Sequence, residues 1–90
     1  MDRQVAVALK YEVEKDLAPK VVAKGFGFLA ETIRRAAEDA GVPIREDEGL
    51  ARALARLRVN QEIPPELYTA VAEILAFIYR MDELAGRSRS

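Results

Sequence analysis

The sequence predicts a small α/β domain, and three features of its pattern support this class. Alternating apolar and small residues near the N-terminus indicate a strand, apolar residues at helical spacing follow from Phe26 onward, and Gly, Pro and Asn separate the segments. Ninety residues allow one domain with a single core. We therefore expect a small mixed sheet of about three to four strands, ringed by about three to four helices and including one βαβ unit.

The first two strands are predicted from local pattern. Residues Val5–Tyr11 alternate, which is typical of a strand with one strongly apolar face. After a charged connection, Ala18-Pro19 keeps the backbone extended, because a residue that precedes proline avoids helical geometry. Residues 20–24 form a short second strand that ends at Gly25.

The period then changes to that of a helix. Gly41 suits the left-handed position just beyond the end of this helix. Val42–Arg45 is predicted as a third, short strand, and its proline indicates an edge or a strand start. Strand, helix and strand in succession predict the βαβ unit, with a right-handed crossover. The apolar stripe of the helix consists of Phe26, Leu29, Ala30, Ile33, Ala37 and Ala40.

Two further helices are predicted after this unit. Asp47 suits the N-cap of the first, and Asn60 can take the left-handed conformation beyond its end. Pro64-Pro65 opens the longest helix, because proline fits a first helical turn. We place the domain at residues 1–84 and a flexible C-terminal tail at residues 85–90.

Composition excludes several kinds of chemistry. Fourteen Lys and Arg against fifteen Asp and Glu give a net charge of −1, so no global field attracts nucleic acid or an anionic membrane. The chain has no His and no Cys, and its serines are Ser88 and Ser90. This excludes imidazole bases, Cys/His metal sites, disulfides and catalytic triads, so we expect no enzyme, no cofactor and no metal. No apolar run approaches the ~18 residues of a membrane span, and no signal-peptide core follows the start.

Two features support a nucleotide- or nucleic-acid-binding alternative. Gly25-Phe26-Gly27 opens a G-x-G-x-x-A match between a strand and a helix, a setting in which backbone amides bind phosphate. Arg52 and Arg56 lie four residues apart on one helical face. However, a dinucleotide fold needs two halves, and no aromatic residues lie between the arginines for base stacking. A small acid–base enzyme would need a carboxyl with a raised pKa in a pocket.

The first strand also presents an unusual edge. Val5, Val7 and Leu9 are apolar, and only four residues precede them. An apolar edge strand is normally protected by charge, proline or a covering element. Either this strand lies centrally between the other two, or another chain covers its edge.

Several blocks of the sequence, in one order, resemble the cytoplasmic C-terminal domain of the FlhB/YscU family, the switch component of flagellar and virulence type III export. The resemblance extends from Val5 to Met81. It implies a compact α/β domain that helps to pass export substrates through the gate and to change the substrate class from rod–hook type to filament type. The blocks are residues 5–11, 18–25, 41–44, 50–54, 63–68 and 70–75.

The resemblance also indicates which features of the family are not found in this sequence. Family members carry four membrane helices ahead of this domain and cleave themselves at an Asn-Pro-Thr-His loop. The four motif positions fall on Met1, Asp2, Arg3 and Gln4, so the asparagine that this route needs is missing. We therefore expect no catalytic residue. We expect a stand-alone counterpart of the cleavage fragment, in the cytoplasm or at the export apparatus on the inner face of the cell membrane.

Two binding surfaces follow from the resemblance. The family's sheet includes a strand before the cleavage loop, whose absence leaves a position open beside Val5–Leu9. A strand from a membrane-embedded FlhB-type protein or from a second copy of this chain would fill it. The family's proposed pocket for export substrates carries over to Ala18, Pro19, Ala72 and Leu75, although ordinary packing of a loop on a helix is the alternative.

Overall fold

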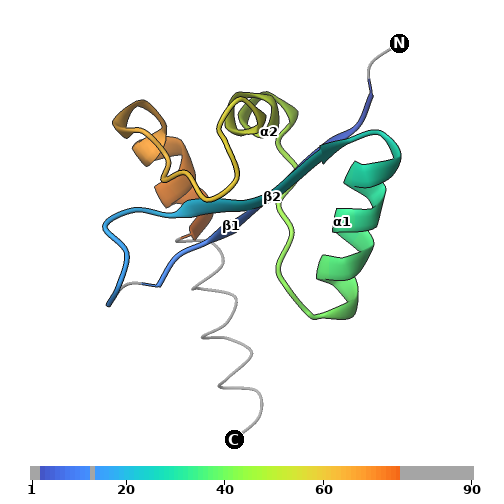
Figure 1. Cartoon of the computed structure of the whole chain (residues 1–90), viewed down its shortest axis with the longest axis horizontal. Coiled ribbons are helices and arrows are strands. Elements are labelled where there is room, and N and C mark those ends of the chain that lie inside the picture. The colour runs from blue at the N-terminus through green and yellow to red at the C-terminus, as the bar shows by residue number, and fades with distance from the viewer. Residues whose placement is uncertain (1–2, 13, 76–90) are drawn as a thin grey trace, which may run out of the picture.

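The computed structural model describes residues 3–12 and 14–75 and shows a two-stranded antiparallel sheet between helices (Figure 1). Strand β1 comprises Val5–Lys10 and strand β2 comprises Lys20–Phe26. Both strands lie where the sequence predicted them, and β2 continues for two residues beyond the predicted end. The α/β class is confirmed.

Helices pack on both faces of this sheet (Figure 1). Helix α1, Phe28–Asp39, follows β2 directly and packs on one face. Helix α2, Glu48–Ala55, lies on the other face. A 3-10 turn, η1, spans Pro65–Leu67 and leads into the last helix, which is described over residues 68–75. The predicted order of elements along the chain is therefore confirmed for the helices.

The two faces of the sheet differ in side-chain size, which decides how closely each helix approaches. Helix α1 packs on the face with small side chains, which we call the small face. It lies so near this face that a Cβ added at Gly25 would be 2.5 Å from Leu29 Cγ. Larger side chains on the other face contact α2 and the last helix. The small face carries Ala6, Ala8, Ala23 and Gly25; the large face carries Val5, Val7, Leu9, Val21, Lys24 and Phe26.

A β-bulge keeps these faces consistent along β2. Ala8 pairs with Ala23 and Leu9 pairs with Val21, so Val22 has no partner across the ladder. The extra residue returns Val21 to the large face, where it is fully buried.

The core lies between the large face, α2 and the last helix. Its buried cluster consists of Ala18, Leu54, Ile63 and Val71. Lys24 also points toward α2, and its Nζ donates to the carbonyl oxygens of Ala55 at 3.0 Å and Leu57 at 2.6 Å. Ala55 is the last residue of α2, where carbonyls lack helical partners and carry partial negative charge, and Leu57 lies just beyond the C-cap Arg56. The ammonium of Lys24 therefore caps α2 from the sheet.

Local signals in the sequence set the ends of the helices. Asp47 is the N-cap of α2, and its Oδ1 accepts from the amide of Leu50 at 3.1 Å. Gly41 and Asn60 have positive φ angles of 72° and 74°. All three predictions are confirmed.

The predicted third strand at Val42–Arg45 and the βαβ unit are wrong within the described residues. Residues 41–49 are exposed, and residues 42–47 form an irregular connection. The two strands are antiparallel neighbours in sequence, so α1 follows the sheet and does not cross between parallel strands. A strand needs a neighbouring edge, and no described strand lies against this segment. The predicted boundary at residue 84 and the tail lie outside the described residues.

Candidate binding surfaces

The outer edge of β1 carries backbone groups that point away from β2. The amide of Gly27 donates to the carbonyl of Gln4 at 2.8 Å, so these two residues form a hydrogen-bonded pair of the ladder. In an antiparallel ladder such pairs alternate with non-hydrogen-bonded pairs. Val5 and Val7 occupy the alternate positions, so their N–H and C=O groups point outward.

The backbone N–H and C=O groups of Leu9, which lies on the other side of the bulge, also point away from β2. Its partner Val21 donates to the carbonyl of Gln61 at 3.0 Å and accepts from the amide of Asn60 at 2.6 Å. Val21 therefore pairs with the chain beyond β2, so Leu9–Val21 is a non-hydrogen-bonded pair of the ladder. Among residues 3–12 and 14–75, β2 is thus partly covered at its outer edge, whereas no strand pairs with the outer edge of β1.

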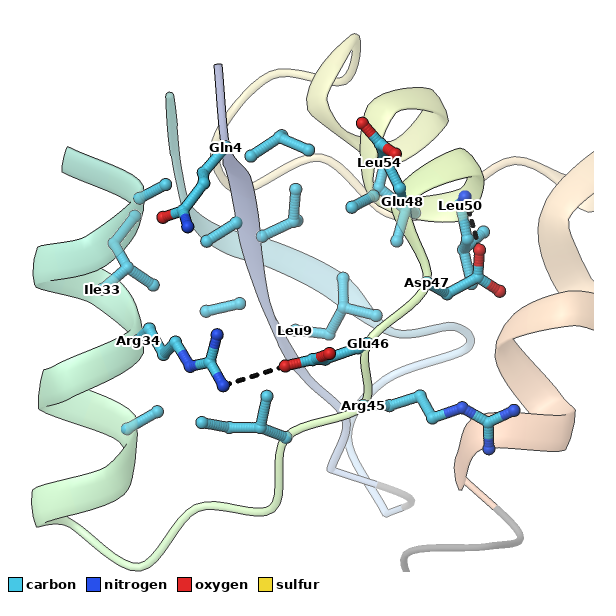
Figure 2. Close-up of a pocket in the computed structure, with 18 of the residues that line it drawn as sticks. Gln4, Leu9, Ile33, Arg34, Arg45, Glu46, Asp47, Glu48, Leu50 and Leu54 are labelled. Carbon is cyan, nitrogen blue, oxygen red and sulfur yellow. Dashed lines mark hydrogen bonds and ion pairs between the residues drawn. The ribbon is translucent and has the colours of Figure 1, made fainter. Parts of the chain in front are cut away.

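This edge lies in a groove of about 510 Å³, which we call the edge groove (Figure 2). Its floor is Val5–Leu9, one wall comes from α1, the other from α2, and the connection after α1 closes the side opposite β1. The walls are mainly apolar. The apolar wall residues are Ala30, Ile33, Ala37, Val42, Pro43, Ile44, Leu50, Ala51, Leu54 and Ile74.

One ion pair crosses the edge groove. Figure 2 shows Arg34 of α1 and Glu46 of the connection pointing toward one another, with Arg34 Nη2 at 2.9 Å from Glu46 Oε1. Their side chains are 49% and 75% exposed, so the pair is solvated and weak. A ligand that enters the groove could separate the pair at low cost.

A second, smaller hollow of about 230 Å³ brings together the four pocket residues that the resemblance implied. Ala18 and Pro19 are buried and form its base, Leu75 is half-buried, and Ala72 is exposed at its rim. We call this the apolar hollow. The placement fits a binding pocket, while the burial of Ala18 and Pro19 also fits the alternative of ordinary packing.

Among the residues of the apolar hollow that the sequence did not predict, two are exposed apolar or aromatic side chains. Leu17 is 93% exposed and Tyr68 is 46% exposed, and both lie at the rim. Leu17 could have been found from the sequence, because an apolar side chain directly before Ala18-Pro19 either packs into the core or remains exposed for binding. Tyr68 could not be found this way, because only the tertiary fold brings it to residue 17.

The charged end of β1 forms a connected network of side chains. Lys10 Nζ lies 2.8 Å from Glu12 Oε1, and this hydrogen bond raises the pKa of Lys10 and lowers the pKa of Glu12. Asp16 accepts from the backbone amide of Glu12 at 3.0 Å, which lowers the pKa of Asp16. Neither carboxyl has the raised pKa that the acid–base alternative needs.

Three of the four groups named for phosphate binding, Gly25, Gly27 and Arg52, are engaged within the protein. The amide of Gly27 donates to Gln4, and Gly25 packs against Leu29. Arg52 donates to Glu48 and to the carbonyl of Arg3, both at 3.1 Å. Arg56 is exposed at the C-cap of α2, and a single exposed arginine does not make the basic patch that nucleic-acid binding needs, so we do not propose this alternative.

The described residues hold neither a metal-binding cluster nor a helix that could span a membrane. They contain no cluster of three His, Cys, Asp or Glu side chains that could hold a metal ion. Among the helices of residues 3–12 and 14–75, none has the length and apolar character needed to cross a membrane.

Comparison with known proteins gives one consistent family. Residues 3–78 match the model of the FlhB HrpN YscU SpaS Family. The chain is 50% identical over 78 residues to the uncharacterized protein YlqH of Bacillus subtilis, which covers 87% of this chain and 84% of YlqH. It is 49% identical over 75 residues to the flagellar biosynthetic protein FlhB of Aquifex aeolicus, which covers 82% of this chain. This chain spans 21% of that FlhB and 23% of the FlhB of Escherichia coli, about a fifth of their length.

Solved structures show the same relationship. The cytoplasmic domain of FlhB from Shewanella putrefaciens superimposes with a TM-score of 0.85 at 38% identity, covering 90% of this chain and 64% of that one. The PscU C-terminal domain gives a TM-score of 0.78 at 39% identity, covering 82% of this chain and 95% of that one.

Proposed function

This chain belongs to the FlhB HrpN YscU SpaS family, and from this membership we propose that it is a non-catalytic component of type III protein export. The relatives named flagellar biosynthetic protein FlhB support a place in flagellar or related export. The neighbour named as the cytoplasmic domain of FlhB supports a position in the cytoplasm, where we place this chain at the export apparatus. A non-catalytic function is supported by the residues Met1, Asp2, Arg3 and Gln4, which provide no asparagine for self-cleavage.

The observation that carries the proposal is the outer edge of β1 in the edge groove. Val5, Val7 and Leu9 present backbone donors and acceptors there, between apolar walls. Addition of a strand to such an edge supplies affinity through main-chain hydrogen bonds and specificity through side-chain contacts. We assign the strand to a membrane-embedded FlhB-type protein of the export gate.

A second copy of this chain fits the edge groove less well. Its own β1 edge lies between its own α1 and α2, which flank the strand as they do in the first copy (Figure 1). Two such flanked edges would bring their walls into collision before their strands could pair. A single extended segment fits between the walls, so homodimerisation through β1 is an alternative outcome of the test.

The test uses one position of β1 and two substitutions. The N–H of Val7 points outward and does not bond to β2. Val7→Pro therefore removes a donor from the edge groove and keeps the hydrogen bonds between β1 and β2 intact. Val7→Ala is the matched control, because it also loses the isopropyl group and keeps the donor. Thermal unfolding of both variants checks that they fold. If V7P does not fold, Val5→Pro at the first residue of the strand replaces it.

The measurement is capture of the FlhB-type protein from the same genome, shortened to lack the region that this chain resembles. We expect capture by the native chain and by V7A, and a loss of about tenfold in V7P, because a buried carbonyl of the partner would lose its donor. Equal capture by V7P and V7A would refute strand addition. Dimerisation of the native chain, abolished in V7P, would assign the groove to a second copy.

The apolar hollow is a second candidate site, for export substrates. The supporting observation is the freely exposed Leu17 beside a hollow that already contains Ala18, Pro19, Ala72 and Leu75. Apolar anchors that enter small hollows dominate many interfaces. Ala72→Glu should abolish binding of rod–hook-type and filament-type substrates, whereas Ala36→Glu, at an exposed site on α1, should not. Equal binding by the two variants would remove the hollow from consideration.

A further inference from the structure

The outer edge of β2, on the side away from β1, is covered along only part of its length. Residues 60 and 61 bond to the outer side of Val21 and cover that end. Lys24 and Phe26 occupy non-hydrogen-bonded pairs of the ladder with β1, so their N–H and C=O groups point outward. Among residues 3–12 and 14–75, no backbone group pairs with these four groups. This short stretch of β2 is therefore open to another chain.

Exposed apolar side chains surround the open stretch. Val22 and Phe26 are 40% and 41% exposed, and Phe28, at the start of α1, is 87% exposed. Leu29 is 52% exposed and lies directly over Gly25. Apolar side chains gathered beside unpaired backbone groups are typical of an interaction surface. We call Val22, Phe26, Phe28 and Leu29 the β2 edge patch.

The hydrogen-bonding pattern of this stretch is complementary to itself. If a two-fold axis at Gly25 relates two copies, the amide of Lys24 in one copy faces the carbonyl of Phe26 in the other. The amide of Phe26 likewise faces the carbonyl of Lys24. The axis repeats this exchange, so all four outward groups of each copy gain a partner. The two Gly25 residues form the close pair at the axis, about 4.5 Å apart at Cα, and neither carries a Cβ.

We propose that two copies of this chain associate through the outer edges of β2, antiparallel, to form one sheet in the order β1-β2-β2-β1. The contact is isologous, because the same patch serves both copies. It uses the opposite edge of the sheet from the edge groove, so it goes beyond the proposed function and does not depend on it.

The side chains of the β2 edge patch match in this register. Counting outward from the axis, Val22 of one copy faces Phe28 of the other, and the Leu29 side chains of both copies lie on the small face beside the axis. Phe26 faces Lys24, whose aliphatic stem can pack on the ring. The patch residues therefore gain their apolar neighbours from the same set of residues. This pairwise match assigns the edge to a second copy.

The covered end of the edge does not block this arrangement. In the proposed register, Val21 of the second copy faces Leu29, which belongs to α1 and not to the sheet. Strand β2 ends at Phe26, and the chain turns at Gly27 into α1 (Figure 1). Residues 60 and 61 of the second copy therefore lie where the first copy has already left the plane of the sheet.

The size of the patch predicts a weak and reversible dimer. Burying the exposed parts of its four side chains would remove roughly 400 Å² of apolar surface per copy from water, or about 800 Å² in total. Stable specific interfaces bury about 1,200–2,000 Å², so this contact belongs to the transient class. We expect a Kd on the order of 10–100 μM.

Sedimentation equilibrium of the full chain over about 5–500 μM measures the dimer. Phe28→Asp would place a carboxylate against Val22 of the second copy, and we expect it to raise the Kd by about tenfold or more. Ala36→Asp is the matched control, because it adds the same charge at an exposed site of α1 away from the patch and should leave the Kd unchanged. Both replaced side chains are exposed, so both variants should fold, which thermal unfolding checks.

A complementary pair of variants tests the register. Val22→Glu and Phe28→Lys should each weaken the dimer alone, because each places an unpaired charge against an apolar side chain. An equimolar mixture should recover the dimer, since the introduced glutamate of one copy faces the introduced lysine of the other and the second Val22–Phe28 contact stays native.

Four results would overturn the proposal. The first is a monomer at every concentration, and the second is a dimer that Phe28→Asp does not weaken. The third is a mixture of the paired variants that recovers nothing. The fourth is a dimer that Val7→Pro abolishes, which would place the contact at β1. If the native chain is monomeric and co-sediments with vesicles of anionic lipid, and Phe28→Asp does not, the β2 edge patch belongs to a membrane surface instead.

Discussion

Replacing Gly25 with alanine tests how closely α1 packs on the small face of the sheet. The new methyl carbon would lie 2.5, 2.8 and 2.9 Å from the Cγ, Cδ2 and Cβ of Leu29. The Cβ belongs to the rigid part of the side chain, so a change of rotamer cannot clear all three contacts. Helix α1 must therefore move away from the sheet.

The expected magnitude follows from two opposing effects. Overpacking of this kind costs about 1–3 kcal/mol, while replacing glycine within a strand recovers about 0.5–1 kcal/mol of chain entropy. We expect Gly25→Ala to lower the free energy of unfolding by about 1–2 kcal/mol, which in a domain of this size lowers Tm by roughly 5–15 °C.

Gly49→Ala in α2 is the matched control. The nearest atom to its added methyl would be Asp47 Oδ1 at 3.8 Å, an ordinary contact, and alanine favours a helix. We expect this variant to raise the free energy of unfolding by about 0.5–1 kcal/mol. Thermal unfolding followed by circular dichroism measures both.

A double substitution completes the test. Adding Leu29→Ala to Gly25→Ala removes the two nearest clashing atoms and should recover part of the lost stability, as a double-mutant cycle would show. If Gly25→Ala is as stable as the native chain, or if Leu29→Ala recovers nothing, the close approach of α1 does not limit packing at this point.

Three further predictions concern the ends of elements. Lys24→Met should lower the free energy of unfolding by about 1–2 kcal/mol in urea titrations, because the carbonyls of Ala55, at the end of α2, and Leu57, just beyond it, lose their donor. Lys15→Met should change it little. Asp47→Ala should cost about 1 kcal/mol through loss of the N-cap, and Asp47→Asn should restore most of it, which equilibrium unfolding would show. Because the pKa of Asp16 is lower in the folded chain than in the unfolded chain, the ionised carboxylate stabilises the fold above pH ~4. This contribution is lost as the pH falls through the pKa of Asp16 in the folded chain. In acid titrations, the difference in stability between the native chain and Asp16→Asn should therefore disappear.

Short-range features of the sequence predicted most of the secondary structure. The alternation of Val5–Tyr11 predicts β1 because the strand is half-buried, and Asp47 and Gly41 mark helix ends through their own backbone preferences. These signals act over a few residues and do not depend on the rest of the fold. They were accordingly confirmed.

Features that depend on distant partners could not be predicted in the same way. Val42–Arg45 has strand propensity, but a strand exists only where another edge is available. The capping of α2 by Lys24 joins residues that are 31 and 33 positions apart. Gly25 was predicted to end the second strand, whereas β2 continues through it to Phe26 and its missing side chain allows α1 to approach the sheet.

The bulge at Val22 has a consequence for how the family can vary in length. Val22 is the extra residue of β2, so losing one residue at this point would restore a regular ladder and leave Val21 and Ala23 on their present faces. Elsewhere along the paired strands, a change of one residue would invert every side chain beyond it. Alignments of relatives should therefore tolerate a one-residue gap at this position, and a shortened β2 in a homologue would not by itself indicate a different fold.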